Sequence, residues 1–204
     1  LKETDPPVGV LSKVERKKET KNPPLLYNLA ELQNECSRYL KISPDETLKI
    51  VQELYEKKLV TYPRTDARVL STAVSKEIYK NIRGLAALDY AGGFVQEVLA
   101  GEAYKKIAST RYVNDKQITD HGAKIYEMIV RRFLSIFYPP AVYQKVNLVS
   151  MIGKERFFSN FRILQEPGYL KVAGMPKEKK NTEGDGENLD ADPALLNALS
   201  ALKK

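Results

Sequence analysis

The pattern of hydrophobic and polar positions changes twice along the chain. Valines alternate with polar residues over residues 8–16, which predicts a half-buried strand. Beyond residue 28 the apolar residues recur at helical spacing, and after Pro140 they alternate again. The order of strand, helices and strands predicts an α+β fold with a helical block between two β segments.

The helical block contains recognisable helix starts. Asn28 and Ser43 are suitable N-caps, since a glutamate follows each of them three residues later, and Pro44 fits the first position of the second helix. Two short helices followed by a strand with Tyr62 predict a helix-turn-helix or winged-helix-like unit. Apolar stripes predict further helices over residues 71–82, 93–100 and 124–137. The expected core positions of the first two helices are Leu29, Leu32, Cys36, Tyr39, Leu40, Leu48, Val51, Leu54 and Tyr55.

The last part of the chain has the pattern of a β-meander. Predicted strands cover residues 142–150, 157–163 and 169–172, with a two-residue turn at Gly153-Lys154. The polar stretch over residues 176–193 predicts a loose loop, and residues 195–202 fit either a strand or a helix.

Charge narrows the choice of partner. The 204 residues carry a formal net charge of +7 and an isoelectric point near 9.3, which favours a polyanionic partner. A basic run over residues 13–21 is either a solvated linker or a contact for phosphate. The single cysteine, Cys36, excludes an internal disulfide and is predicted to be a buried, inert thiol. The polar N-terminus and the absence of a long apolar run predict a soluble intracellular protein without a membrane span.

Residues 58–68 carry the strongest chemical signal. Tyr62, Arg64 and Asp66 lie within five residues, next to Pro63, which stiffens the backbone. A free tyrosine hydroxyl is a weak nucleophile, but an arginine beside it can hold and neutralise a phosphate group. The alternative is structural: a strand with Tyr62 followed by a solvated turn with the two charged residues.

Five segments of the chain, in order, resemble motifs of the type IA DNA topoisomerases, and in particular of the topoisomerase III branch. The resemblance extends over roughly residues 9–174. The matching strings are PPLLYNL at residues 23–29, TYPRTD at 61–66, ITDH at 118–121, RRFLSIFYPP at 131–140 and EPGYL at 166–170.

This resemblance implies an enzyme that cuts and rejoins one DNA strand through a 5′-phosphotyrosine intermediate, without ATP. Tyr62 corresponds to the nucleophile, Arg64 to the arginine at the scissile phosphate, and His121, the only histidine, to one that binds a DNA phosphate. The implied DNA-binding set is Arg64, Arg68 and His121, and the supporting residues are Asp66, Thr119 and Asp120. The family's second histidine-like residue and AIIPT-like string are absent after His121.

The resemblance also implies a division into domains. Residues 1–23 and 141–204 would belong to one antiparallel β domain, into which a helical domain, residues 24–140, is inserted. The implied substrate is single-stranded DNA, and the implied cofactor is Mg²⁺, bound by a TOPRIM domain in the rest of the polypeptide. We therefore expect the chain to be part of a longer cytoplasmic, DNA-associated protein. No metal site is predicted here, because the acidic residues Asp185, Glu187, Asp190 and Asp192 lie in the loose loop.

Two other interpretations compete with this one. A noncatalytic winged-helix DNA-binding module would explain the charge and the helices but not the ordered motifs. A tyrosine recombinase would need several arginines and histidines around the nucleophile, and the chain has a single histidine.

Overall fold

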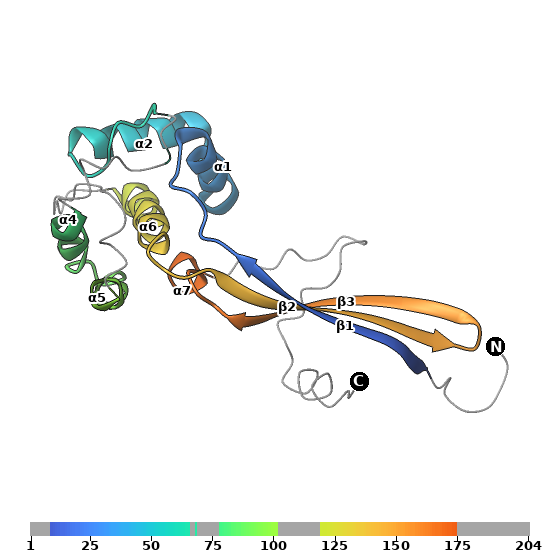
Figure 1. Cartoon of the computed structure of the whole chain (residues 1–204). Helices are drawn as coiled ribbons and strands as arrows, with labels where there is room; N and C mark the ends of the chain where they lie inside the picture. Colours follow the sequence, from blue (N-terminus) through green and yellow to red (C-terminus); the bar gives the residue numbers. More distant parts are fainter. Residues whose placement is uncertain (1–8, 66–67, 69–77, 102–118, 175–204) are drawn as a thin grey trace. The chain divides into compact units, whose positions relative to one another are not determined.

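The computed structural model describes residues 9–65, 68, 78–101 and 119–174 (Figure 1). The chain divides into two compact units. One is helical and comprises Pro23–Pro139 together with Tyr169–Gly174. The other contains the sheet, and its described segments are residues 9–22 and 140–168. The predictions for residues 71–77, 176–193 and 195–202, including the four acidic residues of the loop, lie outside the described residues.

The described part of the β unit is a three-stranded antiparallel sheet in the order β1-β2-β3. Its strands are β1 (Val10–Lys21), β2 (Ala141–Ile152) and β3 (Glu155–Glu166). The predicted hairpin is confirmed: Ile152 pairs with Glu155, and Gly153 in the turn adopts a φ of 63°, which favours glycine. Val146 and Ile163 form the centre of a small apolar cluster on one face.

The prediction for the first segment was too short. The basic run is part of β1, whose pairing with β2 continues to Lys21 opposite Ala141. The solvated-linker interpretation is therefore wrong. Its lysines are exposed strand residues, because a strand at the edge of a sheet can keep charged side chains in water.

Most of the described helices lie where the sequence predicts a helix, although the helix expected from residue 124 begins at Asp120. They are α1 (Leu29–Leu40), α2 (Pro44–Glu56), α4 (Ile78–Leu85), α5 (Gly92–Ala100), α6 (Asp120–Ser135) and α7 (Leu170–Ala173). The predicted N-caps are confirmed, since the Asn28 Oδ1 and Ser43 Oγ atoms accept hydrogen bonds from the backbone N–H groups three residues later. A core of buried side chains joins these helices, with Leu54, Ile82 and Leu134 among its most enclosed members.

Several predictions for the helical unit are corrected. The segment with Tyr62 is not a strand but an irregular stretch after α2, and residues 170–173 form helix α7 of the helical unit rather than a strand. Tyr39 and Tyr55 are 46% and 38% exposed, so they are not core residues. The α+β class with an antiparallel sheet is confirmed, whereas the winged-helix-like arrangement stays a prediction.

Candidate active site

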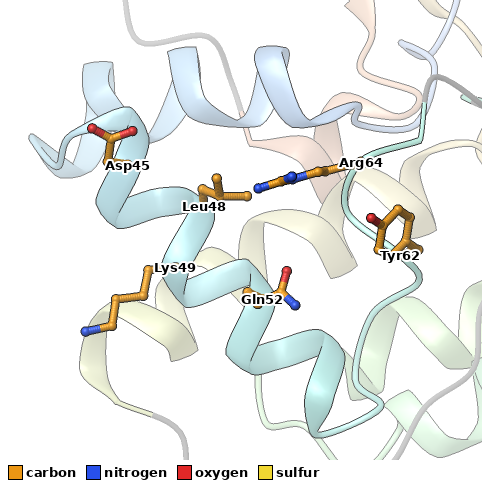
Figure 2. Close-up of a pocket in the computed structure, with 6 residues that line it drawn as sticks. All are labelled: Asp45, Leu48, Lys49, Gln52, Tyr62 and Arg64. Atoms are coloured by element: carbon orange, nitrogen blue, oxygen red, sulfur yellow. The ribbon is translucent and has the colours of Figure 1, made fainter.

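Tyr62 and Arg64 line one pocket together with a face of α2 (Figure 2). The pocket has a volume of about 400 Å³. Figure 2 shows the Arg64 side chain extending across the pocket toward α2, with the Tyr62 hydroxyl turned to the same space. The α2 residues that line it are Asp45, Leu48, Lys49 and Gln52, which share one helix face because they are spaced three or four residues apart.

The end of α2 fixes the start of the segment that carries Tyr62. Lys58 adopts a left-handed φ of 61°, and the Leu59 N–H donates to the Leu54 carbonyl at 2.9 Å. The Leu59 side chain is only 2% exposed, and Pro63 is also buried. The irregular segment is therefore anchored at two apolar points, with Tyr62 between them.

The Tyr62 ring packs against another described aromatic ring and keeps an accessible edge. It meets the Tyr55 ring edge-on, with centroids 5.5 Å apart and an interplanar angle of 75°. Tyr62 is still 51% exposed, so its hydroxyl can be reached from solvent. Tyr55, which the helical pattern placed in the core, thus supports the candidate nucleophile instead.

The pocket offers cationic groups for an anionic ligand. Arg64 and Lys49 both line it, and Asp45 is the one acidic residue among the lining residues. In the described part of the chain, no hydrogen bond or ion pair involves the Arg64 guanidinium. A phosphate in the pocket would therefore meet a planar set of donors beside the Tyr62 hydroxyl.

His121 lies in the first turn of α6, near the first turn of α2. Thr119 is the N-cap of α6, since its Oγ1 accepts from the Gly122 N–H at 3.1 Å, and Asp120 is favourably placed beside the positive end of the helix. The His121 Nδ1 is 3.5 Å from the Glu46 Oε1. His121 does not line the pocket described above, but its partner Glu46 directly follows the lining residue Asp45.

The predicted DNA-binding residue Arg68 is not among the residues that line the pocket. The Arg68 guanidinium donates to the Leu26 carbonyl at 2.8 Å and pairs with the Glu31 carboxylate. Asp66 lies outside the described residues. The sequence motifs do not point to Lys49 and Gln52, although their i, i+3 spacing on the helix before the tyrosine places them on one face.

Two other features are absent from the described residues. Within these residues, no three histidine, cysteine, aspartate or glutamate side chains are grouped as they would be around a metal ion. None of the described helices combines the length and the apolar character that crossing a membrane requires.

Comparisons with known proteins agree with the motifs. The family model described as DNA topoisomerase matches residues 2–198. The chain belongs to this family, within its type IA class. The DNA topoisomerase 3 of Bacillus subtilis is 33% identical over 181 residues, which cover 79% of this chain and 24% of that protein. The DNA topoisomerase 3 of Bacillus licheniformis is 31% identical over 185 residues, covering 81% of this chain and 25% of that protein.

A solved structure has a related fold. The full-length topoisomerase I of Thermotoga maritima superposes with a TM-score of 0.58 at 24% identity, over 87% of this chain and 32% of that one. The chain thus spans about a quarter of the length of the curated relatives described above.

Proposed function

We propose that this chain carries the nucleophile of a type IA topoisomerase, which cuts and rejoins one DNA strand to relax or decatenate DNA. The observation that carries the proposal is the shared pocket of Tyr62 and Arg64. A half-exposed hydroxyl beside a guanidinium, in a protein of net charge +7, suits attack on a DNA phosphate.

The proposed reaction is a transesterification. The Tyr62 Oη forms a bond to the scissile phosphorus while the bond from phosphorus to the 3′ oxygen breaks. The phenolic proton is lost, the 3′ oxygen takes up a proton, and the 5′ phosphate stays on Tyr62. The reverse reaction reseals the strand, so the phosphodiester energy is conserved and no ATP is consumed.

Two further side chains have proposed roles in this reaction. Arg64 offsets the charge that grows on the phosphoryl oxygens in the transition state. His121 holds a DNA phosphate by a hydrogen bond, from a position that Glu46 helps to fix at 3.5 Å. Thr119 and Asp120 support it by starting α6.

The DNA substrate and the Mg²⁺-binding domain are also proposals. We propose single-stranded DNA as the substrate, because the target phosphate must reach a tyrosine within a pocket. We also propose that a TOPRIM domain elsewhere in the polypeptide supplies Mg²⁺, since the described residues contain no grouped set of metal ligands. Bound there, Mg²⁺ would supply further charge stabilisation to the DNA phosphates.

The experiment compares Tyr62→Phe with Tyr55→Phe in the full-length protein. Each change removes a single hydroxyl, and the two rings contact each other, but of the two only Tyr62 lines the pocket. With a 3′-labelled oligonucleotide and Mg²⁺, the wild type and Tyr55→Phe should form a covalent adduct and Tyr62→Phe none. The free energy of unfolding of both variants should lie within about 0.5 kcal/mol of the wild-type value.

A persistent adduct in Tyr62→Phe would overturn the proposal and favour another nucleophile. No adduct with any of the three proteins would favour a noncatalytic DNA-binding module.

A further inference from the structure

Glu31 joins two arginines that are far apart in the sequence. Its Oε2 pairs with the Arg68 guanidinium, while its Oε1 accepts from the Arg132 Nη1 at 3.1 Å. Each arginine also donates to a carbonyl of the segment before α1: Arg68 to Leu26 at 2.8 Å, and Arg132 to Leu25 at 3.0 Å. These contacts connect the chain after Tyr62 with the start of α1 and with α6.

The Arg132 end of this network is the more buried. Arg132 is 8% exposed, its Nη2 donates to the Glu35 Oε1 at 2.9 Å, and its guanidinium lies 3.9 Å from the centre of the Tyr27 ring. Burial alone would lower the pKa of Arg132, but Tyr27 and Glu31 raise it overall. Burial, reinforced by a hydrogen bond to Glu35, raises the pKa of Tyr27. Arg132 is thus a fixed cation that holds Glu31 for Arg68.

The Arg68 end of the network lies just after the segment that carries Tyr62 and Arg64. In the described residues between α2 and Arg68, the backbone has neither helix nor strand. Leu59 and Pro63 anchor this stretch by burial. Leu59 comes before Tyr62, and Pro63 lies between Tyr62 and Arg64, so neither anchor follows the two pocket residues. Arg68 is the next described residue after Thr65, and its two contacts hold it against Leu26 and against Glu31 of α1.

We propose that Arg68 and Glu31 are positioning residues that aim Tyr62 and Arg64 at the scissile phosphate. The inference rests on the proposed function and replaces the expected role of Arg68 as a DNA contact. Its Nε and one terminal nitrogen are already engaged within the protein, so its fork is not presented to a phosphate. An error of about 1 Å in the placement of a reacting group can cost a hundredfold in rate, so a distant clamp can govern cleavage.

Arg131 provides a matched control. Its side chain is 29% exposed, against 30% for Arg68, and it too pairs with a carboxylate, that of Glu127. It also donates to a backbone carbonyl, that of Val172 at 3.1 Å. The Val172 contact ties α6 to α7 and the Glu127 contact lies within α6, so loss of Arg131 should destabilise the helical unit without moving Tyr62 or Arg64.

The test uses the full-length protein with Arg68→Ala, Arg68→Lys, Glu31→Gln and Arg131→Ala. We expect Arg68→Ala to lower the single-turnover cleavage rate by about 10- to 100-fold while DNA affinity changes less than about twofold. Arg68→Lys should restore part of the rate, because one ammonium can meet the Leu26 carbonyl or Glu31 but cannot reproduce the fork. Glu31→Gln should lower the rate in the same direction, because one amide oxygen cannot accept from both arginines. If Arg68→Ala does not fold, Arg68→Lys and Glu31→Gln decide.

The salt dependence of binding separates positioning from DNA contact. A phosphate contact contributes about 0.7 to the slope of log affinity against log salt for a single strand. The slope should therefore be unchanged in Arg68→Ala, and a fall of that size would overturn the proposal. Equal loss of cleavage in Arg131→Ala, or wild-type cleavage in the Arg68 and Glu31 variants, would also overturn it. None of these outcomes contradicts the proposed function. The proposed function fails instead if Tyr62→Phe still forms the covalent adduct.

Discussion

Tyr62 and Arg64 line the same pocket, while Pro63 between them is buried. The backbone of this stretch is neither helix nor strand, so the two side chains share the pocket through local turns and not through a strand pattern. The proline ring restricts φ as well, so the spacing of tyrosine and arginine is held at its centre by an apolar contact. Tyr62 and Arg64 thus reach the pocket, while Pro63 between them packs inside the protein.

Arg64→Lys should lower cleavage more than it lowers DNA binding. The lysine keeps the charge but loses the planar fork. Loss of one transition-state donor costs roughly 1.4 to 4 kcal/mol, so the cleavage rate should fall by about tenfold to a thousandfold. Affinity for single-stranded DNA should fall much less, because many phosphates share the binding energy. Both quantities can be measured on one oligonucleotide.

Arg83→Lys is the control for that substitution. Arg83 lies near the end of α4, exposed and outside the lining of the pocket, so its replacement should leave cleavage unchanged. Equal losses of cleavage and affinity in Arg64→Lys would mean a general backbone contact. Wild-type cleavage would mean that Arg64 has no part in the reaction.

His121→Ala should reduce cleavage in the full-length protein without unfolding the helical unit. A hydrogen bond to a charged group contributes about 1.5 to 3 kcal/mol, so the rate should fall by about 10- to 100-fold. Stability should change by less than about 1 kcal/mol, since His121 and Glu46 side chains are each 47% exposed. Glu46→Gln keeps an oxygen beside Nδ1 and should have the smaller effect. If Glu46→Gln instead lowers the cleavage rate as much as His121→Ala does, the Glu46 carboxylate itself contributes to cleavage.

Local signals account for the parts of the fold that sequence predicted well. Asn28 and Ser43 cap α1 and α2 because their side-chain oxygens reach backbone donors three residues away, within a single turn. The Gly153 hairpin is equally local, because the turn conformation requires a residue that tolerates positive φ. The Tyr62-Arg64 pair was found for a similar reason, since both residues lie in one short motif.

Contacts between distant residues account for what sequence did not predict. Residues 170–173 form a helix because Leu170 and Val172 are buried in the helical unit and the Tyr169 N–H donates to the Pro139 carbonyl, contacts that no short window contains. The pairing of Arg68 with Glu31 spans 37 residues. The tyrosine motif alone therefore gives no sign that Arg68 has a partner on α1, and its role as a DNA contact stays a prediction.

The isolated chain should not relax supercoiled DNA. It spans about a quarter of the length of its curated relatives, and its described residues hold no grouped metal ligands. A plasmid relaxation gel with Mg²⁺ tests this, with the full-length protein as the positive control. Relaxation by the purified chain would show that it contains everything that cleavage and strand passage require.

Cys36 should resist alkylation in the native protein and report unfolding of the helical unit. Its side chain is 0% exposed, and burial raises the pKa of the thiol to about 11, so almost no thiolate is present at pH 8. Iodoacetamide should therefore modify it only through opened molecules. Leu54, 2% exposed in the same core, offers a test: Leu54→Ala should lower the free energy of unfolding by about 2 to 5 kcal/mol and speed labelling by at least about 30-fold.

The raised pKa of Cys36 also makes stability depend on pH. The neutral thiol stabilises the fold below its unfolded pKa of about 8.5, and this contribution is lost as pH rises toward 11. Rapid labelling of the folded wild type at pH 8 would contradict the burial of Cys36.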